Sequence, residues 1–209
     1  MNEYYDNKPL LEKNGDINVI WGPKMIGKTY SYLKLALENF RDNKRTFVYV
    51  KRWNEDVKTI NMKRLIEPSL VETVFGQGYS IAFYRGKFIL KHEDKDDEVV
   101  GWAVAINNQD HVRLQIFNNA QIVILDDFLQ VRSERTIPYE FDCWESILYN
   151  ITRDAPDAKV FILGNVVTKC SPYFIMYNIK PSSMQPGEIK VIKDGPIRIV
   201  AQYCKIPNL

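Results

Sequence analysis

The chain has 209 residues, enough for one large α/β domain, and its 45% hydrophobic content can form a substantial core. Its 28 Lys and Arg against 26 Asp and Glu residues exclude a broad basic field, so any nucleic-acid contact needs local patches. Three widely spaced cysteines predict reduced thiols, and no apolar run is long enough to span a bilayer. We therefore expect a soluble intracellular protein without a membrane partner.

The first elements of the chain surround a glycine-containing loop. Ile17–Trp21 is an apolar run that predicts a buried strand, and Tyr30–Phe40 has helical periodicity. Between them, residues 22–29 read GPKMIGKT and fit the pattern G-x-x-x-x-G-K-[ST]. The first N–H groups of a helix have no intrahelical partner, so with the loop lysine they bind phosphates. The sequence therefore predicts a nucleoside triphosphate site.

We expect the whole loop to contact the nucleotide, with the lysine on the phosphates and the threonine on Mg²⁺. The predicted contact residues are Gly22, Pro23, Lys24, Met25, Ile26, Gly27, Lys28, Thr29 and Tyr30. Lys24 is either a second cation near the phosphates that acts as a catalytic trigger, or a solvated side chain.

The next segment predicts a second core strand, an irregular helix and a small antiparallel insertion. Thr46–Lys51 is rich in β-branched and aromatic residues, as strands are, and Asn54–Leu70 is expected to be a helix that Pro68 ends. The insertion covers about residues 80–106. Its expected pieces are the hairpin Ser80–Tyr84 and Lys87–Leu90, a solvated loop His92–Glu98 and a strand Val99–Ile106.

The second half predicts a return to a parallel core. Gln121–Leu125 and Lys159–Leu163 are short apolar runs typical of strands buried on both faces, and Glu140–Thr152 is an amphipathic helix. A C-terminal β-hairpin is expected at about residues 189–204. Alternating strands and helices predict an α/β fold in which helices flank a mostly parallel sheet.

Two carboxylates directly follow the apolar strand Gln121–Leu125. In a P-loop protein we expect Asp126 to hold Mg²⁺ mainly through water, and Asp127 to orient or deprotonate the attacking water. The alternative is an acidic pair that caps a loop. About a hundred residues separate the motifs, which leaves room for an extra strand–helix unit between them. This spacing, with the acidic residue after Asp126, predicts a P-loop hydrolase of the additional-strand type.

Three further polar residues stand at element ends, and each has two interpretations. Asn165 either hydrogen-bonds the γ-phosphate or attacking water, or only satisfies a turn. Arg153 either ends its helix favourably against the dipole, or is an arginine finger for a neighbouring subunit's site. Arg52 follows the second strand at the edge where ligands bind, and faces nucleotide, DNA or a neighbour. Near the N-terminus, Tyr4 and Tyr5 either stack on a base or pack internally.

The order of these pieces resembles the DNA-packaging (encapsidation) ATPases of small phi29-type tailed phages, over nearly the whole chain. No single piece is specific, but their order and spacing together are. Besides the loop and the following Tyr30 and Ser31, the matching segments are Phe47–Trp53, Gly101–Ile106, Ile122–Leu129, Thr152–Asp154, Lys159–Asn165, Ser171–Phe174 and Ile192–Gly195.

The resemblance implies a ring motor that uses ATP and Mg²⁺ to thread double-stranded DNA into a procapsid in the host cytoplasm. Lys28, Thr29 and Asp126 match the family's phosphate and Mg²⁺ residues, and Arg153 matches its trans-acting finger. The implied partners are further copies of the chain (a pentamer when assembled), the phage portal and a packaging RNA. Residues 1–209 would form the ATPase domain, without the nuclease-like C-terminal domain of the family.

One residue departs from the family pattern, which has Asp-Glu at the second motif. Asp127 is one methylene shorter than glutamate, and catalysis depends on placement at that scale. Either a slight shift of the site lets Asp127 reach the attacking water, or Glu134 or Glu140 takes the role of the missing glutamate, or the chain hydrolyses ATP slowly. Two alternative functions remain: a helicase-loader-type ATPase on single-stranded DNA, and an ATP-binding scaffold or switch that barely hydrolyses.

Overall fold

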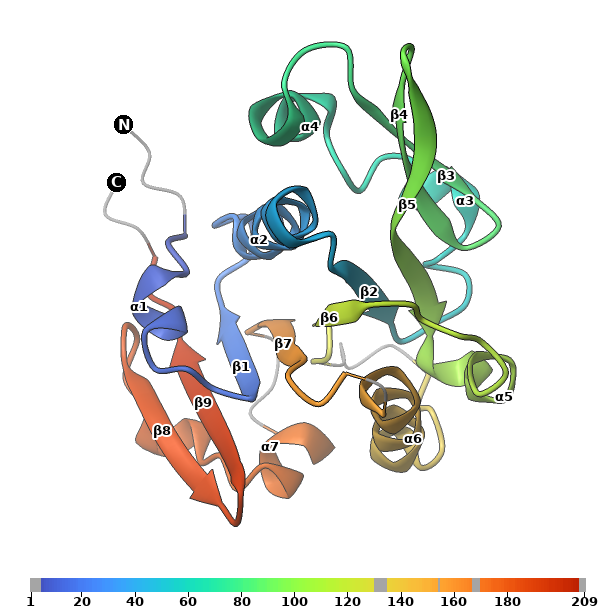
Figure 1. The fold of residues 1–209 in the computed structure, drawn as a ribbon. Coiled ribbons are helices and arrows are strands. Elements are labelled where there is room, and N and C mark those ends of the chain that lie inside the picture. The colour runs from blue at the N-terminus through green and yellow to red at the C-terminus, as the bar shows by residue number, and fades with distance from the viewer. Residues whose placement is uncertain (1–4, 130–134, 154, 167–169, 207–209) are drawn as a thin grey trace.

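The computed structural model describes residues 5–129, 135–153, 155–166 and 170–206. These residues form a nine-stranded sheet with helices on both faces (Figure 1). The strand order is β3-β4-β5-β2-β6-β7-β1-β9-β8. The strands are β1 (Ile17–Gly22), β2 (Thr46–Lys51), β3 (Ser80–Tyr84), β4 (Lys87–His92), β5 (Lys95–Ala105), β6 (Ala120–Asp126), β7 (Lys159–Asn165), β8 (Ile189–Asp194) and β9 (Ile197–Tyr203). The helices are α1 (Lys8–Leu11), α2 (Lys28–Asn43), α3 (Thr59–Met62), α4 (Pro68–Phe75), α5 (Gln109–Val112), α6 (Glu140–Thr152) and α7 (Pro172–Met176), with 3-10 turns at Ile106–Asn108 and Pro181–Ser183.

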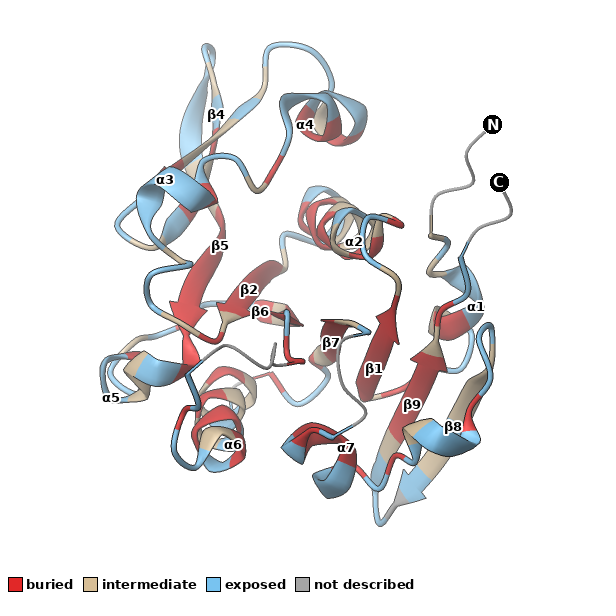
Figure 2. Ribbon diagram, turned by 180° about the vertical axis from the view of Figure 1, so that it is seen from behind, coloured by how far each residue is buried: buried red, intermediate tan, exposed pale blue. Residues whose placement is uncertain are grey.

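Six neighbouring strands, β5, β2, β6, β7, β1 and β9, are mutually parallel, and antiparallel strands extend the sheet at both edges. Successive side chains of a strand point to opposite faces, and the apolar strands supply both. Val123 and Leu125 of β6 join the cluster that includes α6 and α7, whereas Ile122 and Ile124 join the cluster with α2 and α4. The central strands are therefore buried on both faces (Figure 2).

The predicted α/β fold of the additional-strand type is confirmed in its sheet order, because β7 separates β1 from β6. The strand that separates the two motif strands in the sheet, β7, comes after the second motif in the chain. The residues between the motifs form β2, the antiparallel β3 and β4, and β5, which pairs in parallel with β2 and is followed by α5. The predicted C-terminal hairpin is confirmed as β8 and β9.

Two local predictions were wrong. Pro68 begins α4 and does not end a helix: it lies at the first helical position, where a missing N–H costs nothing and the fixed φ favours a helix. The residues before it contain only turns and the short α3. The charged run His92–Glu98 was expected to be a loop, yet β5 begins at Lys95. The charges at the start of β5 are exposed, so this part of the strand keeps its side chains in solvent.

The C-terminal hairpin supports the start of the predicted nucleotide loop. β9 pairs with β1, and the Cys204 N–H donates to the Trp21 carbonyl at 2.7 Å. A Cβ added to Gly22 would lie 2.6 Å from the Cβ of Cys204, so a side chain at Gly22 would force the two segments apart. Burial raises the pKa of the Cys204 thiol to about 12 and keeps it neutral. Among the described residues, no helix is both long and apolar enough to cross a membrane.

Candidate nucleotide site

The loop after β1 has the backbone of a phosphate-binding turn. Gly27 has a φ of 93°, a left-handed value that glycine adopts without steric cost, and α2 begins at the next residue. The residue at the N-cap of α2 is Gly27, which has no side chain to cap the helix. The first N–H groups of α2 and the positive end of its dipole therefore remain directed at whatever binds the loop. These groups favour an anion such as a phosphate.

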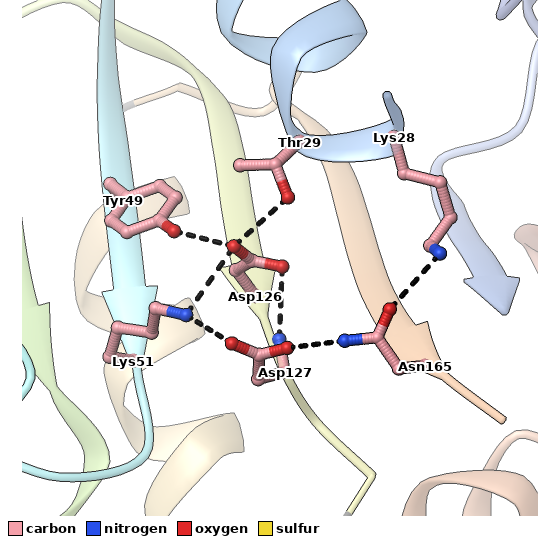
Figure 3. A network of polar contacts seen from close by, with 7 residues as sticks. All are labelled: Lys28, Thr29, Tyr49, Lys51, Asp126, Asp127 and Asn165. Carbon is pink, nitrogen blue, oxygen red and sulfur yellow. Dashed lines mark hydrogen bonds and ion pairs between the residues drawn. The ribbon is translucent and has the colours of Figure 1, made fainter. Parts of the chain in front are cut away.

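Lys28 is held among oxygen atoms at the base of this loop. Its side chain is only 6% exposed, and its Nζ donates to the Pro23 carbonyl at 2.6 Å and to Asn165 Oδ1 at 3.2 Å. Burial lowers the pKa of this amine, while the carboxylates of Asp126 and Asp127 act in the opposite direction. The lysine thus connects the loop to the end of β7 (Figure 3).

Asp126 lies at the carboxyl end of β6, where three side chains converge on one of its oxygens (Figure 3). Oδ2 accepts hydrogen bonds from Thr29 Oγ1 at 3.1 Å and from the Tyr49 hydroxyl at 2.5 Å, and Lys51 Nζ lies 3.4 Å away. Mg²⁺ prefers oxygen ligands and is bound in nucleotide sites through one or two side chains together with phosphates and water. The adjacent Thr29 and Asp126 oxygens fit that requirement, and their role as Mg²⁺ ligands stays a prediction.

Asp127 follows in a left-handed conformation with a φ of 61°, which aspartate tolerates. Its carboxylate forms an ion pair with Lys51 and accepts a hydrogen bond from Asn165 Nδ2 at 2.9 Å. The Asp127 side chain is 53% exposed, so it also reaches solvent. Because Asn165 also accepts from Lys28, a continuous polar path joins the loop lysine to the second carboxylate (Figure 3).

Sequence reasoning missed Tyr49 and Lys51. Burial opposes the charge of Lys51, but Asp126 and Asp127 outweigh it and raise the pKa of the amine, so this lysine is a cation at neutral pH. A signal was present in the strand. Phe47, Tyr49 and Lys51 are every second residue of β2 and therefore share one face of the sheet, the face on which α2 packs. β2 is also the neighbour of β6. The parity of β2 therefore places both side chains beside Asp126.

Tyr49 and Lys51 line a cleft of about 560 Å³ at the carboxyl edge of the sheet, whereas Lys28 and Thr29 are not part of its lining. Lys24 lines it, as do Asp126, Asp127 and Asn165. The side away from the loop is formed by the segment after β2. That wall, which we call the cleft mouth, consists of Trp53, Asp56, Asn61, Met62 and Leu65.

Arg52 was expected to face nucleotide, DNA or a neighbour. It borders the cleft, but its guanidinium is held in an ion pair within the chain. It is 3% exposed, and its Nε and Nη2 donate to the two oxygens of Glu140, each at 2.8 Å. Glu140 also accepts from the Tyr173 hydroxyl at 3.2 Å. This engagement is also the reason why Glu140 is a poor substitute for the missing glutamate. Glu134, the other suggested substitute, lies outside the described residues.

The other residues that were predicted to contact the nucleotide differ in exposure and in position. The Met25 side chain is 98% exposed, whereas Ile26 is buried and its carbonyl accepts from the Tyr5 N–H at 2.8 Å. Tyr30 lines a separate groove beside α1 and α4. Tyr5 hydrogen-bonds Tyr32 and Gln202 through its hydroxyl, which favours packing over base stacking. Tyr4 lies outside the described residues.

Arg153 lies on the opposite edge of the sheet from the cleft. It follows α6, and the chain then enters β7 at Lys159, which pairs with Ile122 near the start of β6. Asp157, in the connecting segment, accepts a hydrogen bond from Gln121 at that same edge. The seven-residue β6 separates this edge from Asp126 by about 20 Å. The chain's own cleft is therefore out of reach of Arg153.

Comparisons with known proteins agree with this fold. A sequence profile of the podovirus DNA encapsidation protein (Gp16) family matches residues 1–190. The DNA packaging protein of Bacillus phage B103 is 22% identical over 175 residues, which are 82% of this chain and 51% of that protein. The chain thus spans about half the length of the curated relatives it matches.

Two solved structures are similar over nearly the whole chain. The N-terminal domain of the DNA packaging ATPase from bacteriophage phi29 has a TM-score of 0.79 at 18% identity, with 97% of each chain covered. The Phi-28 gp11 DNA packaging motor has a TM-score of 0.80 at 21% identity, covering 98% of this chain and 60% of that one. At these identities, the structural similarity establishes the fold.

Proposed function

The chain belongs to the podovirus DNA encapsidation protein (Gp16) family, and we propose that it is an ATP-hydrolysing subunit of a motor that moves double-stranded DNA into a procapsid. The observation that carries this proposal is the polar path from Lys28 through Asn165 to Asp127 and on to Asp126 and Thr29. It joins the phosphate loop to both carboxylates. Such a constellation suits phosphoryl transfer to water, which needs positioning and charge neutralisation.

Each residue of the site has its own role in the proposed hydrolysis of ATP. Thr29 and Asp126 would hold a magnesium ion bound with ATP, which would supply charge neutralisation at the phosphates. Lys28 and the N–H groups of α2 bind the phosphates. Asp127 accepts the proton of the attacking water, because its carboxylate is exposed to the cleft and held by Asn165. Lys24 adds a second cation at the cleft.

Arg153 completes the site from a neighbouring subunit. An arginine supplied in trans to phosphoryl transfer is worth about 10³–10⁵ in rate. The placement of Arg153 on the edge away from its own cleft supports a role in trans and argues against one in cis. We therefore propose a ring of copies, a pentamer when assembled, that acts with the portal and a packaging RNA in the host cytoplasm. DNA would be held through its phosphates, without sequence preference and with strong salt dependence.

One observation favours a second candidate, a nucleotide-dependent switch that barely hydrolyses ATP. The carboxylate of Asp127 is ion-paired with Lys51, and aspartate is shorter than the glutamate of the family pattern. A base held by this pair can be slow to reach the water. In that case nucleotide binding, rather than turnover, would change the conformation.

ATP turnover per subunit, measured against protein concentration with double-stranded, single-stranded or no DNA, separates these candidates. A motor completed in trans predicts turnover that rises with concentration and is stimulated most by double-stranded DNA. Preference for single strands would favour a helicase-loader-type ATPase. Tight ATP binding with negligible turnover under all conditions would reject the motor in favour of the switch.

A further inference from the structure

Tyr49 brings a hydroxyl group through the hydrophobic core to the floor of the nucleotide site. Its side chain is 0% exposed and belongs to the apolar cluster on the α2 face of the sheet. Among the described residues, the hydroxyl has one hydrogen-bond partner, Asp126 Oδ2 at 2.5 Å, and Figure 3 shows the ring pointing at that oxygen. A phenylalanine at this position would fill the same space in the core. Packing alone therefore does not account for the hydroxyl.

The three donors to Asp126 Oδ2 differ in what else they do. Thr29 is a predicted metal ligand and stands at the start of the helix that follows the phosphate loop. Lys51 also pairs with Asp127, and a lysine side chain is flexible. Tyr49 has no second task, and its buried ring with only two χ angles has little freedom to move. Tyr49 is therefore the donor that stays on Oδ2 when the loop and the lysine respond to a ligand.

A donor fixed in this way also fixes the carboxylate. Asp126 is 7% exposed, and its other oxygen, Oδ1, accepts the Asp127 N–H at 3.0 Å. Burial raises the pKa of Tyr49 well above its usual value, and the charge of Asp126 acts in the same direction, so the hydroxyl keeps the proton that it donates. Because Oδ2 is held by the buried hydroxyl, the carboxyl group cannot turn freely and its two oxygens are not equivalent.

Divalent cations differ in what they require of such a carboxylate. Mg²⁺ demands a nearly ideal octahedral arrangement of oxygens and is bound through one or two carboxylates together with water and phosphates. Ca²⁺ accepts six to eight oxygens in flexible geometry and binds carboxylates through one oxygen or both. A carboxylate with one oxygen held by a fixed hydroxyl cannot easily offer both oxygens to a cation. This restraint disfavours Ca²⁺ and costs Mg²⁺ little.

We propose that Tyr49 makes the predicted metal site selective for Mg²⁺ over Ca²⁺, because its hydroxyl keeps Asp126 from presenting both oxygens to the ion. The proposal rests on the proposed function, which calls for a metal ion bound with ATP, and it adds what selects that ion. Tyr49 is a positioning residue that acts through Asp126 and is not itself a ligand. The charge of Lys51 cannot supply this selectivity, because both ions carry the same charge and are repelled alike.

The variant Tyr49→Phe tests the proposal, because it removes the hydroxyl and keeps the ring. The dissociation constant of a fluorescent ATP analogue is measured with Mg²⁺ or with Ca²⁺ in excess over the nucleotide, and the ratio of the Ca²⁺ value to the Mg²⁺ value gives the selectivity. The wild type should bind at least about tenfold more tightly with Mg²⁺, and Tyr49→Phe should lower the ratio about tenfold. That is the lower end of the effect of one hydrogen bond to a charged group, since Thr29 and Lys51 still contact Oδ2.

Tyr32→Phe is the matched control. Tyr32 is also 0% exposed in the same apolar cluster, but its hydroxyl is hydrogen-bonded to Tyr5. This variant should leave the ratio as in the wild type. Lys51→Met should change binding with the two ions by the same factor and thus also leave the ratio unchanged.

Equal binding of the wild type with the two ions would overturn the proposal, as would an unchanged ratio in Tyr49→Phe. A ratio that falls as far in Tyr32→Phe or in Lys51→Met would also overturn it, because the loss would then not belong to the Tyr49 hydroxyl. Since the measurement needs no hydrolysis, a lowered ratio in a protein without turnover would keep this role of Tyr49 and reject the proposed function. Turnover stimulated by double-stranded DNA with an unchanged ratio would do the reverse.

Discussion

Two ionic clusters lie at the carboxyl edge of the sheet, and they differ in how far their charges are satisfied. Arg52 and Glu140 hold each other through two hydrogen bonds, and their side chains are 3% and 10% exposed. Asp126 and Asp127 share Lys51, yet the Asp127 side chain remains 53% exposed toward the cleft. In the closed cluster both charges are satisfied within the chain, so it supports the fold. The open cluster still has oxygen positions for water, a metal ion or an incoming cation.

The largest expected effect tests the open cluster. Asp127→Asn should lower ATP turnover by about 10²–10⁴, because the amide cannot take a proton from water. ATP should still bind and remain trapped, since Lys28 and Thr29 are unchanged. Turnover and equilibrium nucleotide binding measure the two effects, with Asp97→Asn as a control on the exposed edge of the sheet. Hydrolysis that survives in Asp127→Asn would place the base elsewhere.

Variants of the closed cluster should change the stability of the protein. Arg52→Ala leaves Glu140 buried without its partner, and we expect it to reduce the free energy of unfolding by about 3–5 kcal/mol. The double change Arg52→Met with Glu140→Gln removes both charges and should recover part of that loss. Urea unfolding of the three proteins checks both statements. An Arg52→Ala protein of normal stability that no longer binds nucleotide would invert the assignment of the two clusters.

The loop lysine should affect affinity. Lys28→Ala removes a cation that would hydrogen-bond phosphate, a loss of about 1.5–3 kcal/mol per charged hydrogen bond, or about 10–100-fold in affinity. Lys24→Ala removes an exposed lysine of the same loop and should weaken binding less. Titration with a fluorescent ATP analogue compares them. Equal affinities for Lys28→Ala and the wild type would disprove the loop assignment.

The smallest effect concerns pH. Asp126 and Asp127 raise the pKa of Lys51 above its usual value despite burial, so the amine is charged at all lower pH and loses its proton only as pH rises through that raised pKa. Between about pH 7 and pH 9.5 the ion pair should therefore not titrate. The pH–rate profiles of the wild type and Lys51→Met should have the same shape over that range. A basic limb present only in the wild type would show that Lys51 titrates there.

Local patterns predicted much of the site, and non-local contacts account for what they missed. Lys28, Thr29 and Asp126 stand at fixed places relative to a strand and a helix, so their motifs located them. Lys51 could be placed only once β2 was known to lie beside β6. Arg52 could not be assigned from its strand, because its partner Glu140 is 88 residues away in the sequence.

Two predicted element boundaries were wrong for similar physical reasons. Proline either ends a helix or begins one, and Pro68 does the latter because apolar residues at helical spacing follow it and pack on α2. The charged start of β5 extends beyond the core in a hairpin, where exposed side chains are no obstacle to strand pairing.

Mixing two inactive variants tests the central claim most directly. Lys28→Ala lacks a functional loop but keeps Arg153, and Arg153→Ala lacks the arginine but keeps its loop. If the site is completed by a neighbour, ATP turnover stimulated by double-stranded DNA should partly return when the two proteins are mixed. The ATP concentration is kept too low to fill the weakened Lys28→Ala loop, so that neither variant alone turns over ATP at an appreciable rate. A mixture that assembles into mixed oligomers yet shows no recovered turnover would contradict a site completed in trans.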